Sequence, residues 1–199
     1  MMKIQHFALL GITFLTLMSF SFLQYTEEDE PNYYSSDYII TYGQAGPFTL
    51  NSAFPGKEGE YMGYQLVQRK QIRYAEDGAD TLTTFHAQKD GITHIIIHPK
   101  YNNDALIGGL EVVSALYETK HGVGVGSSLY DFYAIYPDAK GYYTFVSDMY
   151  WVEYPVMEGI QFLIDAKACK TEPDAFSDLT VIEKSNLNLK SRITGIRIF

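Results

Sequence analysis

Two histidines four residues apart have the spacing that most resembles a metal site. His94 and His98 lie in the apolar run 91–98, which the pattern predicts to be a strand. Residues an even number apart in a strand point to the same face, so the two imidazoles could share a metal ion with a third ligand. No third ligand stands at a recognisable spacing. We therefore expect no metal and no cofactor, and we assign both histidines to the exposed strand face, where they can contribute to a binding surface.

Three glycines precede the best helix candidate and could form an anion-binding loop. Gly122, Gly124 and Gly126 would allow close approach of a ligand to the backbone, and a helix N-terminus attracts negative charge. The chain lacks both the G-x-G-x-x-G fingerprint and the lysine of a nucleotide-binding loop. A tight turn between a strand and a helix is the simpler interpretation.

Candidates for a nucleophile or for an acid pair are isolated in the sequence. Cys169 has no neighbouring histidine, and Glu153 could pair with Glu158 or Asp165 as in a glycosidase. In an acidic chain such carboxylate pairs arise by chance. We therefore expect a protein that is not an enzyme. The alternative is an envelope hydrolase whose site is assembled from residues distant in sequence.

Aromatic side chains are dense in the second half and give the strongest hint of function. Residues 130–154 contain Tyr130, Tyr133, Tyr136, Tyr142, Tyr143, Tyr150, Trp151 and Tyr154. Large rings with a polar tip suit binding surfaces, although strand alternation sends some of them into the core. We expect one set to form an exposed apolar patch on a sheet face. The predicted binding residues are Tyr142, Tyr150, Trp151, Tyr154, His94 and His98.

The N-terminal segment predicts export. Residues 1–21 combine Lys3, an apolar run and small residues at the end of that run, which is the pattern of a cleaved signal peptide. The alternative is an uncleaved anchor. The run is near the lower limit for a bilayer span, so we expect no stable membrane span after cleavage. Residues 22–36 mix acids, proline and serine and predict a flexible tether. We expect the protein in the periplasm or outside the cell.

The net charge limits the class of partner, and the cysteine content excludes a disulfide within the chain. The net charge is −9, and loss of Lys3 would make it about −10. This balance argues against a nucleic-acid partner, because phosphate binding needs clustered Lys and Arg. Cys169 is the only cysteine. A disulfide within the chain is therefore impossible, and a hydrophobic core must hold the fold.

Two pairs of segments are similar to each other. Gly91–His98 aligns with Arg192–Phe199, and Leu50–Phe54 aligns with Val125–Leu129. Such self-similarity predicts two copies of one supersecondary unit. The alignment predicts equivalent buried positions for Ile95, Ile97, Ile196 and Ile198. The resulting divisions are a first repeat at 37–100, a connecting strand segment at 101–120, and a second repeat at 121–199 with a loop at 166–191.

Local patterns fill these divisions mainly with strands. Alternation and turn signals predict strands at 64–74, 81–87, 92–98, 141–146, 149–154, 159–165 and 193–199. Residues 106–117 could form a strand or a helix, and the pair Gly108-Gly109 favours the strand. Ser128 followed by Asp131 resembles a capping box at the start of a short helix that Pro137 ends. A further short helix is possible near 175–179.

The segments 124–131, 91–97 and 192–198 resemble the motifs of tandem-repeat exported bacterial proteins of the β-lactamase-inhibitor-protein class. This resemblance covers roughly residues 40–199. It implies an α+β fold of two tandem repeats, each a short helix packed on an antiparallel β-meander, and an exported location. In the first repeat Pro55 and Gly56 interrupt the expected helix, which shortens it to a single turn. The resemblance transfers no catalytic residues.

The sequence therefore favours a non-catalytic exported binding protein. Its expected partner is a protein or a surface glycan of the cell envelope, recognised through an aromatic sheet face. The alternatives are the envelope hydrolase and a structural accessory factor of the envelope. The oligomeric state is not predicted.

Overall fold

The computed structural model describes residues 36–75, 78–171 and 178–199 of the chain. The expected signal peptide, residues 1–21, lies outside the described residues, as does the tether except for Ser36. Within the described ranges no helix is both long enough and apolar enough to cross a membrane.

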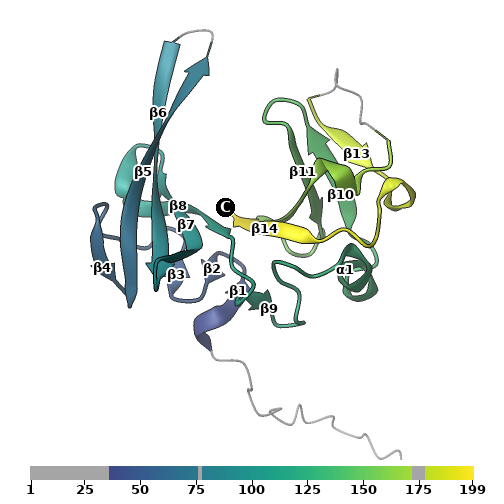
Figure 1. Cartoon of the computed structure of the whole chain (residues 1–199), viewed down its shortest axis with the longest axis horizontal. Helices are drawn as coiled ribbons and strands as arrows, with labels where there is room; N and C mark the ends of the chain where they lie inside the picture. The colour runs from purple at the N-terminus through teal and green to yellow at the C-terminus, as the bar shows by residue number, and fades with distance from the viewer. Residues whose placement is uncertain (1–35, 76–77, 172–177) are drawn as a thin grey trace, which may run out of the picture. The chain divides into compact units, whose positions relative to one another are not determined.

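Ten strands form the larger of two sheets. They are β4 (Gly59–Tyr61), β5 (Tyr64–Ala75), β6 (Gly78–Lys89), β7 (Ile92–Lys100), β8 (Asn103–Val112), β10 (Lys140–Thr144), β11 (Met149–Glu153), β12 (Ile160–Ile164), β13 (Thr180–Ile182) and β14 (Ile193–Ile198). Their order in the sheet is β13-β10-β11-β12-β14-β8-β7-β6-β5-β4, with every neighbouring pair antiparallel (Figure 1). The strand β14 thus joins the first half of the sheet to the second.

The smaller sheet and the helices account for the remaining elements. The smaller sheet has the order β3-β2-β1-β9, in which β1 and β9 run parallel. Its strands are β1 (Ile39–Thr41), β2 (Gln44–Ala45), β3 (Phe48–Thr49) and β9 (Glu118–Thr119). Short 3-10 turns occur at η1 (Ser36–Tyr38), η2 (Ala166–Ala168) and η3 (Lys184–Asn186), and the α-helix is α1 (Leu129–Ile135).

One face of the larger sheet carries the core. Ile95, Ile97, Ile196 and Ile198 are buried, as predicted. Alternate residues of a strand share a face, so each pair of isoleucines points into the core together. Ile95 and Ile196 pair with Val112 from opposite sides of β8. Side chains from the smaller sheet and from α1 belong to the same core. Burial of these large apolar groups is the main source of stability in a chain without a disulfide.

The helix α1 forms where the capping residues predict it. The backbone N–H of Asp131 donates to Ser128 Oγ at 3.1 Å, which satisfies a free N–H of the first turn. Leu129, Phe132 and Tyr133 are buried on one side of the helix. The ring of Phe132 meets that of Phe162 on β12 at 4.9 Å between centroids. This contact fixes the helix on the core face of the second half.

The predicted α+β class is wrong, because the described fold is mostly β. Among the described residues α1 is the only α-helix, and the first half has none. Residues 50–56 form turns and a single bridge instead of the expected helical turn. Asn51 and Gly56 both have φ near +60°, a left-handed conformation that interrupts a right-handed helix. Residues 39–49, which come before this segment, contain the short strands β1 to β3.

The loop predicted at 166–191 also contains structure. It includes η2, η3 and the strand β13, which pairs with β10 at the edge of the larger sheet. Most of the possible helix at 175–179 lies outside the described residues. The strand expected within the 101–120 connection is present as β8, and β12 and β14 pair as predicted across the loop.

A matching set of backbone hydrogen bonds occurs in both halves. Residues 51–54 exchange hydrogen bonds with residues 105–107 in β8, and residues 126–129 exchange them with residues 191–193 at the start of β14. By this pattern the counterpart of β14 is β8, whereas the alignment predicted β7. The strands β8 and β14 pair with each other, with Glu111 opposite Arg197 at the middle of the register.

Candidate functional site

The face of the larger sheet opposite the isoleucines carries a row of mostly polar side chains. His86, Ile96, Glu111, Arg197 and Gln161 stand in register on β6, β7, β8, β14 and β12. All five are partly exposed. We call this surface the outer face. It crosses the join between the two halves of the sheet.

Arg197 and Glu111 form the centre of the outer face. Arg197 Nε donates to Glu111 Oε2 at 3.2 Å, and Arg197 Nη1 reaches Met149 Sδ on β11 at 2.6 Å. His98 Nε2 lies 3.9 Å from the same carboxylate oxygen, close enough for an ion pair when the imidazole is protonated. The Glu111 side chain is only 20% exposed. The cluster is therefore partly shielded and held in a defined geometry.

The histidine at the end of the row is biased toward its neutral form. Burial and the nearby charge of Arg69 lower the pKa of His86, and Glu111 opposes the shift. A neutral imidazole can donate one hydrogen bond and accept another. It therefore adds hydrogen-bonding capacity to the outer face without adding charge.

Trp151 and Tyr142 lie on the outer face beside the arginine cluster. Their rings stack with centroids 5.4 Å apart, and Trp151 Nε1 donates to Glu153 Oε2 at 3.2 Å. Trp151 is only 6% exposed, so the expectation that it forms an exposed anchor is wrong. The stacked Tyr142 ring and the Glu153 carboxylate are its immediate neighbours on this face. Tyr142 is the more accessible of the two rings.

The other two predicted aromatic residues lie on the core side of the sheet. The ring of Tyr150 packs against Tyr143 at 4.5 Å between centroids, and the ring of Tyr154 packs against Tyr136 at 5.0 Å. Both are partly buried against the core. The structure therefore divides the predicted aromatic surface between the two faces instead of forming one patch.

His94 and His98 do not share a face, because the pairing of β7 with β6 contains a bulge. The register shifts between Ala87 and Gln88, and His94 is the residue without a partner in that register. Such a bulge places two successive residues on one side. His94 is buried, its Nδ1 is 2.9 Å from Ser114 Oγ, and its ring lies near those of Tyr64 and Tyr117.

This geometry separates the predicted histidine pair. His98 remains on the outer face beside Glu111, and burial lowers the pKa of the core histidine His94. In the part of the chain that the structure describes, no group of three or more His, Cys, Asp or Glu side chains is placed to hold a metal ion. Cys169 is partly buried, and burial raises the pKa of its thiol, which favours the unreactive protonated form.

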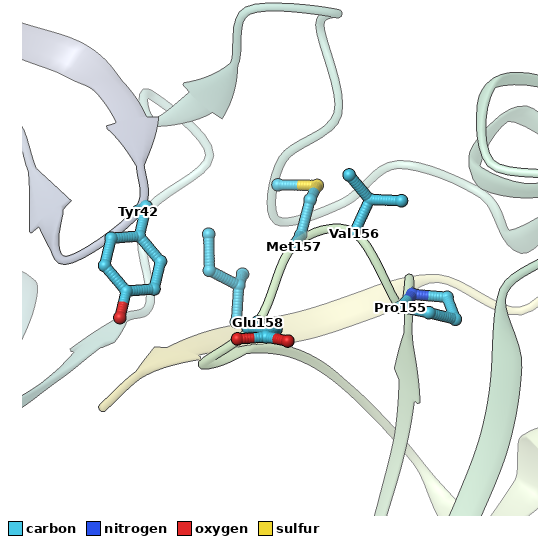
Figure 2. Close-up of a pocket in the computed structure, with 6 residues that line it drawn as sticks. Tyr42, Pro155, Val156, Met157 and Glu158 are labelled. Carbon is cyan, nitrogen blue, oxygen red and sulfur yellow. The ribbon is translucent and has the colours of Figure 1, made fainter.

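Two adjoining hollows lie between the β1–β2 turn and the β11–β12 loop. The first has a volume of about 460 Å³ and is lined by Tyr42, Ile160 and the loop residues 155–158. Figure 2 shows the Tyr42 ring across from the loop that carries Val156, Met157 and Glu158. Tyr42 and Val156 are each 77% exposed. Large apolar groups are thus accessible at this position.

The second hollow has a volume of about 400 Å³ and shares Tyr42, Val156 and Met157 with the first. Its remaining lining residues are Ile40, Thr41, Thr119, Lys120, His121, Tyr136 and Tyr154. The Tyr136 hydroxyl is 3.1 Å from Thr119 Oγ1, and this contact fixes its ring beside Tyr154.

Sequence reasoning predicted Tyr154 as a binding residue and named Tyr136 as part of the aromatic-rich segment, but it did not predict the other lining residues of the hollows. Tyr42 and residues 155–158 lie in turns, where no hydrophobic periodicity marks a function. Tyr42 follows β1 of the smaller sheet, and residues 155–158 join β11 to β12 of the larger sheet. The two segments therefore meet only through the tertiary fold. Local sequence patterns carry no signal of this proximity.

Comparison with known proteins supports the fold alone. No family model and no curated protein matches the sequence. The crystal structure of the uncharacterized protein YfeY from Escherichia coli matches with a TM-score of 0.50 and 13% sequence identity, covering 80% of this chain and 98% of that chain. The two proteins share a β-rich arrangement.

Proposed function

We propose that this chain is an exported, non-catalytic binding protein that recognises a protein partner of the cell envelope through the outer face. The observation that carries the proposal is the cluster of Arg197, Glu111 and Met149 on the same sheet face as the stacked Tyr142 and Trp151. Arginine, methionine and aromatic residues are enriched where proteins bind one another. The expected export rests on the signal pattern of residues 1–21.

The geometry favours a protein over a glycan as the partner. A sugar ring stacks best on a flat aromatic face that is open to solvent, and Tyr142 stacks on Trp151, which is itself 6% exposed. The centre offers instead the Arg197 guanidinium and the His98 imidazole, both placed against the Glu111 carboxylate. Such preformed polar groups reduce the entropy lost on binding a protein surface.

The matching hydrogen bonds of the two halves support a further part of the proposal. We infer that the halves are structural repeats related about the β8–β14 join, in keeping with the resemblance to the β-lactamase-inhibitor-protein class. Glu111 and Arg197 occupy corresponding places in the two strands. Opposite charges at corresponding places make the centre of the outer face asymmetric, which suits recognition of one partner in one orientation.

Site-directed cross-linking tests the proposal. A photo-reactive phenylalanine replaces Tyr142 on the outer face or, as a control, Tyr101, a tyrosine that is 89% exposed in the β7–β8 turn. In cells that export the protein we expect a discrete protein adduct from position 142 and none from position 101. The adduct should weaken when Arg197→Glu is added. An adduct that a glycosidase removes would point to a glycan, and equal labelling from both positions would overturn the outer face as the site.

A further inference from the structure

The second hollow carries positive charge in an acidic protein. Its lining includes Lys120 and His121 and no acidic residue, whereas the chain has a net charge of −9. Both basic residues are exposed. Neither forms an ion pair with any of the residues that the structure describes. The ammonium group of Lys120 and the ring N–H of His121 are therefore available to an anion that enters the hollow.

Aromatic rings form the wall behind these basic groups. Tyr136 is buried and its ring contacts His121 at 6.1 Å and Tyr154 at 5.0 Å between centroids. Ile40, Tyr42, Val156 and Met157 complete the apolar lining. A volume of about 400 Å³ lies within the range of small-molecule sites, which are mostly apolar with a few oriented polar groups. An apolar wall with a basic rim has the chemistry that an amphipathic anion requires.

We propose that the second hollow binds a small organic acid with a flat apolar group. The apolar group lies between the rings of Tyr154 and Tyr42, and the carboxylate meets Lys120 and His121. This site is separate from the outer face and goes beyond the proposed function. The first hollow is less suited to the same ligand, because Glu158 is part of its lining and would repel a carboxylate.

The test compares an acid with its uncharged amide. The purified protein is titrated with 4-phenylbutyrate and with 4-phenylbutanamide by calorimetry. Backbone amide NMR shifts are followed for residues 40–42, 119–121, 154, 156 and 157. We expect the acid to bind at least about tenfold more tightly than the amide, since a charge-assisted hydrogen bond is stronger than a neutral one. Binding of the acid should weaken as the salt concentration rises.

Two pairs of variants separate this site from non-specific binding. Lys120→Gln should weaken binding of the acid by about five- to tenfold, whereas Lys57→Gln, which removes an exposed lysine outside the hollow, should not. Tyr42→Ala should also weaken it, whereas Tyr101→Ala should not. Equal affinity for acid and amide, the absence of binding, or shifts outside the hollow would overturn the proposal. Unchanged melting temperatures would show that the variants fold.

Discussion

Substitution of Ile196 by alanine tests the assignment of the two sheet faces. Ile196 is fully buried, lies opposite Val112 on β8 and Phe162 on β12, and precedes Arg197 on the outer face. The substitution removes three carbon atoms, worth about 0.8 kcal/mol each by transfer. A residual cavity of roughly 60 Å³ adds about 1.5 kcal/mol. We expect a loss of about 4 kcal/mol in the free energy of unfolding.

The adjacent variant Arg197→Ala is the matched control. The Arg197 side chain is 38% exposed and that of Glu111 is 20% exposed, so the ion pair is only partly shielded from solvent. An exposed ion pair contributes about 0.2–1 kcal/mol. Urea unfolding followed by circular dichroism measures both variants. With a slope of about 2 kcal/mol per molar urea, the midpoint should fall by roughly 2 M for Ile196→Ala and by less than about 0.5 M for Arg197→Ala. Equal losses would refute the face assignment.

Three further predictions concern buried or capping residues. Trp151→Ala should cost about 3–5 kcal/mol by the same urea assay, because the ring is buried. The emission of Trp151 should be blue-shifted and resistant to quenchers, and red-shifted emission would contradict its burial. Ser128→Ala should cost about 1 kcal/mol through loss of the α1 cap, while Ser185→Ala, in the exposed turn η3, should change little. Gly124→Ala should lower the melting temperature, because a Cβ there would collide with the Tyr117 carbonyl oxygen, and a melting temperature unchanged from the parent would argue against this packing.

The parts of the fold that depend on local periodicity were predictable. Alternating burial in Ile95 and Ile97, and again in Ile196 and Ile198, follows directly from the period of a strand, and the structure buries all four. The α1 cap was predictable for the same reason, since Ser128 and Asp131 are neighbours in the sequence. Each of these features is determined by residues a few positions apart.

The parts that failed depend on an inserted residue or on distant partners. A bulge in β7, opposite Ala87 and Gln88 of β6, moves the extra residue His94 into the core and separates it from His98. The sequence of β7 alone does not show where its pairing with β6 shifts register. The first-half helix failed because Asn51 and Gly56 take left-handed backbone conformations. The hollows depend on Tyr42 approaching a loop more than a hundred residues away along the chain.

The β8–β14 join affects the order in which the strands of the larger sheet can pair. Residues 64–112 can form a four-stranded meander from neighbouring strands, but β8 then has a free edge until β14, some 86 residues later, arrives. Contacts between distant segments form slowly. A free edge beside buried isoleucines invites pairing with another chain. While the chain folds, this edge is therefore the place where two copies could exchange β14 and form a domain-swapped dimer.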